Sequence, residues 1–359
     1  MHTANPSLAG KIIQKAVATK DENLQLAVAH YFTYPPSGAL DHSDIQVIER
    51  LLTHRAVAVK KAAIRCLSKF KDAWRRKAID LAKRIDVGED CELADALCSI
   101  FDDKHGIPFS ALTDKDISAI LKKLVDIPTL GNHGHNVEEF LASATKHAPI
   151  PVVQLLFKRL DRARGRRRAG REYTPIPYSG FQGGLKGISS YASYQSILDE
   201  ALRRSYKAEG LDTFWLPILF KDISDGYCEL SLNKLKEWGE SGHPGKLKAV
   251  SLLLKEAPAS FLFDHMEFAV DLLEKAHNVG EDCFRKVGSD LYSCALTEGR
   301  HGPAGQPMPQ DVNLRERSTQ ALSKLQPGSP AYRFYESLQK LAEGNIKDDL
   351  ARFEEEFSD

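Results

Sequence analysis

The residues best suited to chemistry form a dense cluster of cations near the middle of the chain. Eight Lys and Arg side chains lie between positions 158 and 171, against one acid, Asp161. Like charges at this density repel one another, and they are tolerated where solvent or an anionic partner neutralises them. With the aromatic residues that follow, the candidate binding residues are Lys158, Arg159, Arg162, Arg164, Arg166, Arg167, Arg168, Arg171, Tyr173 and Tyr178.

Three interpretations of this cluster stay open. Arginine presents a planar fork of donors that matches phosphate, and tyrosine rings can stack on bases, which together favour nucleic acid or another polyanion. The acidic face of another protein would satisfy the same charges. A solvated basic loop without a partner is the third interpretation. A steep loss of affinity for short DNA or RNA with added salt would indicate the first.

No catalytic or nucleotide-binding signature accompanies the cluster. Gly245-Lys246 has neither the glycine five residues earlier nor the hydroxyl directly after it that a phosphate-binding loop needs. Neither a Gly-x-Ser-x-Gly elbow nor a His-Glu-x-x-His motif occurs. His133 and His135 are a close histidine pair, but the further ligands of a zinc site are missing nearby. We therefore expect a protein that is not an enzyme and holds no metal or other cofactor. An enzyme whose site assembles from scattered residues is a further hypothesis, which a buried cluster of histidine and carboxylates in a cleft would indicate.

The composition is typical of a folded protein in a reducing compartment. Hydrophobic residues make up 42% of the chain and charged residues 27%, and 49 cations balance 49 acids. The total charge therefore selects no class of partner. The six cysteines include no C-x-x-C pair, and Cys91 and Cys98 are spaced to share a helix face within a core. Because neither a signal-like start nor a long apolar run is present, we expect a cytoplasmic protein without a membrane contact.

Apolar residues recur every three or four positions along most of the chain, which predicts helices. Ile45 and Ile48 begin one such stripe, with Ser43 as the expected cap, and Thr113 is expected to cap a helix whose stripe includes Ile117 and Ile120. No sustained two-residue alternation indicates a strand. The fold class that this pattern predicts is all-α.

One helix carries a more specific pattern. Val59-Lys60-Lys61-Ala62-Ala63-Ile64-Arg65-Cys66-Leu67 has small or apolar residues at 59, 63, 66 and 67, with a cation after the first. This stretch resembles the second helix of a HEAT repeat. The same resemblance is found in a second segment, Leu314-Arg315-x-x-Ser318-x-x-Ala321-Leu322. The resemblance implies an α-α superhelix, that is, a HEAT/ARM-like solenoid of stacked antiparallel helix pairs. Small residues such as Ala63 and Cys66 would let a neighbouring helix pack close to the backbone.

Two segments rich in glycine and proline divide the expected array. We predict an N-terminal helical array at 1–164, a basic loop at 165–189, a second helical array at 190–298, a linker at 299–310 and capping helices at 311–359. The capping region is expected to hold a helix that starts at Pro330 and a separate final helix from about Asn345. A second cationic region, between Lys60 and Arg84, is expected to form mainly the solvent faces of two adjacent helices.

Two further stretches resemble a particular group of proteins. The first stretch is Phe157-Lys158-Arg159-Leu160, which is followed by Tyr173-x-Pro175-Ile176-Pro177. The second lies near the end of the sequence and reads Gly328-Ser329-Pro330-Ala331-Tyr332-Arg333-Phe334-Tyr335-Glu336-Ser337-Leu338. Both resemble the C-terminal helical region of large bacterial NACHT-like ATPase defence proteins. The resemblance implies a sensor or scaffold module of a bacterial-type intracellular assembly. We therefore expect a non-enzymatic scaffold that binds another protein through a concave helical face and the Arg-rich loop. The alternative is a nucleic-acid-binding helical repeat protein.

Overall fold

The computed structural model describes residues 6–34, 40–70, 74–130, 135–170, 172–177, 185–303 and 306–356. Within these ranges the regular structure is entirely helical, with 18 α-helices and no strand, which confirms the predicted all-α fold. None of the helices described is long and apolar enough to span a membrane. The chain forms two compact units, 1–185 and 186–359, and their boundary falls within the segment predicted as the basic loop.

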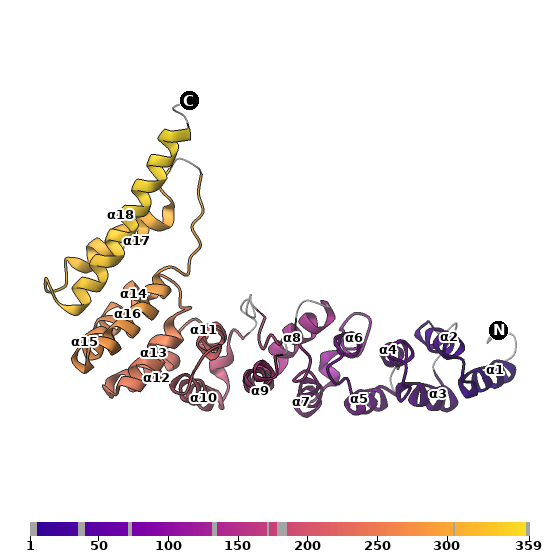
Figure 1. Cartoon of the computed structure of the whole chain (residues 1–359). Helices are drawn as coiled ribbons and strands as arrows, with labels where there is room; N and C mark the ends of the chain where they lie inside the picture. The colour runs from indigo at the N-terminus through magenta and orange to yellow at the C-terminus, as the bar shows by residue number, and fades with distance from the viewer. Residues whose placement is uncertain are drawn as a thin grey trace. The chain divides into compact units, whose positions relative to one another are not determined.

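Unit 1 is a stack of helices in two layers (Figure 1). One layer contains α2, α4, α6 and α8, and each of them contacts the next. The other layer contains α1, α3, α5, α7 and α9, in which α1 packs on α3, and α7 packs on both α5 and α9. Contacts of α1 with α2, α3 with α4, and α8 with α9 join the layers. The helices are α1 Pro6–Ala18, α2 Glu22–Thr33, α3 His42–Leu52, α4 Val57–Cys66, α5 Arg75–Arg84, α6 Cys91–Cys98, α7 Asp114–Lys123, α8 His135–His147 and α9 Pro149–Arg168.

Small side chains allow the close packing of α2 and α4. Ala29 on α2 and Ala63 on α4 are fully buried, and the Cys66 thiol donates to the Ala29 carbonyl at 3.1 Å. A larger residue at either alanine would push the helices apart, at a cost of about 1–3 kcal/mol. The predicted close approach at Ala63 and Cys66 is confirmed.

Two predicted helix starts have different outcomes. Thr113 caps α7 as expected: its side chain accepts from the Asp116 N–H, and the Asp116 carboxylate accepts from the Thr113 N–H. The cap predicted at Ser43 is wrong, because the Asp41 side chain accepts the Asp44 N–H and so caps α3 two residues earlier. Ser43 lies inside the first turn, where its hydroxyl donates to Asp41.

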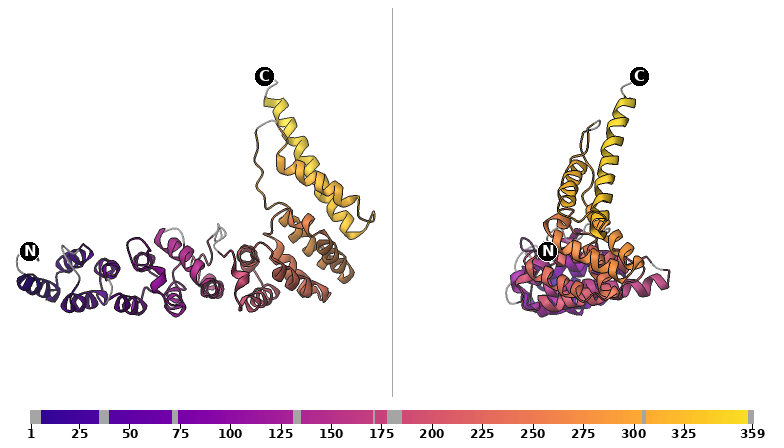
Figure 2. Two further views of the ribbon diagram at one scale, coloured as in Figure 1. Left: turned by 180° about the vertical axis from the view of Figure 1, so that it is seen from behind. Right: turned by 90° about the vertical axis from the view of Figure 1, so that its left-hand side faces the viewer.

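Unit 2 is also built from packed helices, with α13 and α16 at its centre. Helix α13 contacts α10, α11, α12, α15 and α16, and its Val250, Leu253 and Leu254 are fully buried. Helices α17 and α18 lie side by side along most of the length of α17 (Figure 2). The helices are α10 Tyr194–Tyr206, α11 Asp212–Ile223, α12 Glu229–Glu240, α13 Pro244–Leu254, α14 Phe261–Asp264, α15 Met266–Val279, α16 Glu281–Ala295, α17 Pro309–Leu322 and α18 Pro330–Glu356.

Two predicted boundaries need correction. Helix α9 continues through Gly165 to Arg168, so the first part of the predicted basic loop is helical. The break expected before Asn345 is absent, and α18 is one helix of 27 residues. Its buried face continues past Gly344, since Ala342 and Asp349 are both buried. The Asn345 amide also donates to Asp311 on α17 at 2.8 Å. These contacts outweigh the weak helix propensity of a single glycine.

Candidate functional site

The predicted cationic cluster includes a residue that the fold has placed in its core. The Arg159 side chain is fully buried. Its Nε donates to the Pro175 carbonyl at 2.9 Å and its Nη2 to the Thr174 carbonyl at 2.7 Å. Its Nη1 donates to the carbonyls of Leu124 at 2.5 Å and Ile127 at 2.8 Å. The guanidinium thus ties the segment 172–177 and the turn after α7 to α9.

Tyr173 and Arg166 belong to the same internal cluster. The Tyr173 hydroxyl donates to the Val125 carbonyl, and its ring lies 4.5 Å from the Arg159 guanidinium carbon and 5.8 Å from that of Arg166. Arg166 is only 6% exposed and donates to a Glu89 carboxylate oxygen at 2.8 Å. Burial raises the pKa of Tyr173 to about 12 and lowers that of Arg159 to about 10, so the phenol stays neutral and the guanidinium charged at pH 7.

These contacts argue against the prediction that the three residues bind a polyanion. Arg159, Arg166 and Tyr173 already have partners inside unit 1, where donors bound to buried carbonyls cannot also serve a ligand. A signal for this was present in the sequence. Arg159 falls at helical spacing within the apolar stripe that includes Val152, Leu156 and Ala163, and all four residues are buried.

The remaining candidates that the structure describes are Lys158, Arg162 and Arg164, all exposed on α9. Arg162 is half exposed and lies 2.7 Å from Asp126, and Arg164 lies 3.9 Å from Asp161. Lys158 is exposed. The side chains of Arg167 and Arg168, and the whole of Arg171 and Tyr178, lie outside the described residues.

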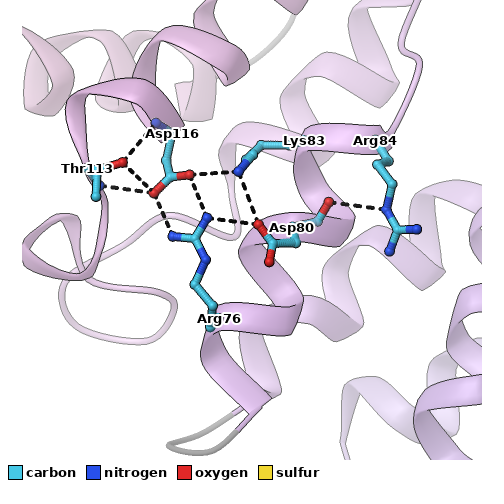
Figure 3. A network of polar contacts seen from close by, with 6 residues as sticks. All are labelled: Arg76, Asp80, Lys83, Arg84, Thr113 and Asp116. Carbon is cyan, nitrogen blue, oxygen red and sulfur yellow. Dashed lines mark hydrogen bonds and ion pairs between the residues drawn. The ribbon is translucent and has the colours of Figure 1, made fainter.

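The second cationic region joins neighbouring helices in unit 1. Asp116 on α7 is buried and receives two bonds from the Arg76 guanidinium of α5, at 2.7 and 2.8 Å, and a third from the Lys83 ammonium at 2.9 Å (Figure 3). Asp80 on α5 accepts from Arg76 and Lys83 as well. Hydrogen bonds from Arg76, Lys83 and Thr113 hold the pKa of Asp116 far below its usual range. Arg76 and Lys83 therefore reach solvent, as predicted, but are matched to carboxylates of their own unit.

No described part of the chain brings together three or more side chains that could hold a metal ion. His135 begins α8 and pairs with Glu139 at 2.8 Å. His133, the other member of the predicted histidine pair, lies outside the described residues.

Unit 2 contains a pocket whose polar groups mostly bind one another. It has a volume of about 270 Å³ and lies among α14, α16, α17 and α18. Arg300 donates to Asp311 and to Asp349, both at 2.7 Å. Arg317 donates to Asp264 at 2.5 Å and lies over the Phe263 ring. These pairs hold α17 and α18 against the preceding segments. Each of the two arginines in the pocket therefore already has an acidic partner.

A second hollow in unit 2, which we call the α16–α18 groove, has a different character. Its volume is about 330 Å³, and it is lined by Phe284, Arg285, Gly288, Ser289 and Tyr292 of α16 and by Arg333, Phe334 and Ser337 of α18. This lining contains two arginines and three aromatic rings, but no acid. Nothing lies within 4 Å of the position that a Cβ at Gly288 would take, so the floor of the groove is open.

The arginines of the groove differ in their surroundings. The Arg333 guanidinium lies 5.8 Å from the Phe284 ring, on the wall formed by α18. Arg285 pairs with Asp282 one turn earlier on α16, and both side chains are highly exposed, so solvent and salt weaken that pair. This groove has no signature in the sequence, because its two walls come from segments more than 40 residues apart.

No protein-family model matches the chain, and no curated protein matches it. The case for function therefore depends on the geometry described above. Among the surfaces described, the α16–α18 groove is an open hollow whose lining holds two arginines and no acid. By contrast, Arg159, Arg162 and Arg166 of α9, and Arg300 in the other pocket, bind acids or carbonyls of their own unit.

Proposed function

We propose that the chain is a non-enzymatic helical scaffold that binds an acidic segment of another protein in the α16–α18 groove. The observation that carries this proposal is the composition of the groove lining, with Arg285, Arg333 and three aromatic rings and without an acid. Aromatic residues and arginine are the side chains that contribute most to binding energy at protein interfaces.

The groove suggests how such a segment would bind. An apolar side chain of the partner would occupy the space above Gly288, between the rings of Phe284 and Tyr292. Carboxylates on either side of it would accept from Arg285 and Arg333, because the guanidinium fork matches the two oxygens of a carboxylate. The volume of about 330 Å³ is large enough for one bulky side chain and small enough to require a short recognition segment.

The alternative of a nucleic-acid-binding protein gains no support from the residues that suggested it. Arg159 and Tyr173 serve carbonyls of unit 1, Arg166 is paired with Glu89, and Arg162 is matched by Asp126. A phosphate backbone would have to break these contacts before it could gain its own.

The test is the affinity of the full chain for two labelled peptides, Glu-Glu-Phe-Glu-Glu and Lys-Lys-Phe-Lys-Lys, measured by fluorescence anisotropy at low salt. We expect the acidic peptide to bind and the basic one not to bind. Arg333→Glu should weaken binding about tenfold or more, because it replaces an attraction by a repulsion. Gly288→Leu should do the same by filling the floor of the groove.

The matched control is Lys324→Glu, which makes the same change of charge at an exposed position just after α17. It should leave the affinity within about twofold, apart from a small effect of net charge. Equal losses for Arg333→Glu and Lys324→Glu, or no binding of the acidic peptide at low salt, would remove the groove as the binding site.

A further inference from the structure

Helix α18 presents one continuous polar stripe to solvent. Arg333, Ser337, Lys340, Gly344, Asp348, Ala351 and Glu355 are spaced by three or four residues, which places all seven positions on one face of the helix. Every one of them whose side chain is described is exposed. The buried residues of α18, which include Ala331, Leu338 and Ala342, lie on another face, against the rest of unit 2. Nothing described in unit 2 covers this stripe.

The charges along the stripe are complementary about its centre. Lys340 and Asp348 lie four residues on either side of Gly344, Ser337 and Ala351 lie seven residues away, and Arg333 and Glu355 lie eleven residues away. If a second copy of α18 crossed the first in the opposite direction at Gly344, each cation would face an acid. The two remaining positions would pair a serine with an alanine, which are small enough for close approach.

Gly344 is the least expected residue of the stripe. A glycine at an exposed position inside a helix costs about 1 kcal/mol relative to alanine. Nothing described in this chain requires the missing side chain, since no atom lies within 4 Å of where its Cβ would be. A helix that crossed at this point would use the gap, because the side chains at a crossing set the distance between two helix axes.

The stripe also leads into the α16–α18 groove. Arg333 and Ser337 belong both to the stripe and to the groove lining. In the antiparallel arrangement, the acidic end of the second helix would lie at this groove. On the face of that end which would meet the groove lies position 355, a glutamate, whereas Phe353 is half a turn away from the stripe.

We propose that a second copy of this chain docks antiparallel on the stripe of α18, with the acidic position 355 of each copy opposite Arg333 at the α16–α18 groove of the other. The inference rests on the proposed function and names the partner segment. The segment of the same copy is excluded as the occupant, because Glu355 is 22 residues beyond Arg333, or about 33 Å along a straight helix. The contact is self-complementary, as a two-fold dimer requires.

The expected dimer is weak and depends on salt. Exposed ion pairs each contribute little, and Lys340 also pairs with Glu336 on its own helix at 3.0 Å. The charges therefore mainly set the register and direction, and the close contact of the two helices around Gly344 provides most of the affinity. A helix of 27 residues is about 40 Å long, and its contact with one partner helix and a groove falls near the lower end of specific interfaces, about 1,200 Å². We expect a dissociation constant in the micromolar range, which rises with ionic strength.

The experiment is sedimentation equilibrium of the full chain from about 1 to about 100 μM at low salt, a range chosen to bracket that affinity. Lys340→Asp and Asp348→Lys should each weaken the dimer about tenfold, because each places two pairs of like charges face to face. The double swap K340D/D348K should restore most of the wild-type affinity. Lys324→Asp, with the same change of charge outside the stripe, should leave the affinity unchanged.

A second variant tests the crossing point independently of charge. Gly344→Gln should raise the stability of the monomer, since glutamine is the better helix former, and should abolish dimerisation by blocking close approach. A wild-type chain that stays monomeric at the highest concentration, or a double swap that fails to restore a dimer lost in the single variants, would overturn the inference. If the acidic peptide binds the groove of such a monomer, the proposed function stands while the dimer is excluded.

Discussion

Replacing Arg159 by methionine should destabilise unit 1 more than any other change in the cationic cluster. Methionine keeps most of the length of the side chain but removes the charge and every donor. Five carbonyl groups lose a buried donor: those of Leu124, Val125, Ile127, Thr174 and Pro175. Each buried acceptor left without a donor costs about 1–3 kcal/mol. Val125 keeps the Tyr173 hydroxyl as a donor, and for the other carbonyls together we expect a loss of about 3–5 kcal/mol.

The size of this loss can be measured as a shift in melting temperature. In a unit of 185 residues, 1 kcal/mol corresponds to about 2–4 °C, so we expect a drop of roughly 6–20 °C in the transition of unit 1. Hydrogen exchange provides a local measurement. The Thr174 amide donates to the Pro128 carbonyl at 2.8 Å, and it should exchange much faster once the 172–177 segment is released from α9.

The control for this prediction is Lys158→Met on the same helix. Lys158 is exposed, so its loss should change stability by no more than about 0.5 kcal/mol. If the cluster were a surface of mutually repelling charges, both substitutions would be neutral or stabilising. Equal melting temperatures for Arg159→Met and Lys158→Met would refute the internal role of Arg159.

Three other perturbations test contacts elsewhere. Asp116→Asn should cost about 1.5–3 kcal/mol in urea unfolding, as expected for hydrogen bonds to a charged group whose cationic partners reach solvent. Because pairing lowers the pKa of Asp116 in the folded chain, the wild type should lose stability as the pH falls below the unfolded-state value of about 3.9, and the variant should lose less. Iodoacetamide at pH 8 should label Cys91 much faster than Cys66, since burial raises the pKa of the Cys66 thiol to about 11; equal labelling rates would contradict the packing of α4. Asp225→Ala should cost about 2 kcal/mol, because Asp225 accepts hydrogen bonds from the Gly187 and Ser189 amides and the Ser189 hydroxyl; an unchanged urea midpoint would show that this loop is not held there.

The parts of the fold that depend on local pattern were predictable from the sequence. The cap at Thr113 and the apolar stripe after it need only neighbouring residues, and so do the small residues of α4 that admit α2. The failed cap at Ser43 was also a local matter, since Asp41 and Asp44 lie within the same turn. Distant contacts decide the other failure: a break was expected before Asn345, but α17 lies beside α18, whose buried face is continuous.

The candidate site was harder to predict for the same reason. A run of arginines has the same appearance in the sequence whether it binds phosphate or carbonyls of its own chain. Only the path of the segment 172–177 shows that the donors of Arg159 are already used within its own chain. The α16–α18 groove has no local signature either, since Phe284 and Arg333 become neighbours only when α18 packs on α16.

The way in which α5 is attached determines how unit 1 responds to its surroundings. On one side, Lys77 lies 2.6 Å from Glu49 of α3, and on the other, Arg76 and Lys83 hold Asp116 of α7. The cationic side chains at both joints reach water, so dissolved ions weaken them, while the buried apolar contact between α2 and α4 is insensitive to ions. Added salt would therefore weaken the polar part of the attachment of α5, while its buried side chains Ala78, Ile79 and Ala82 keep the helix in the stack.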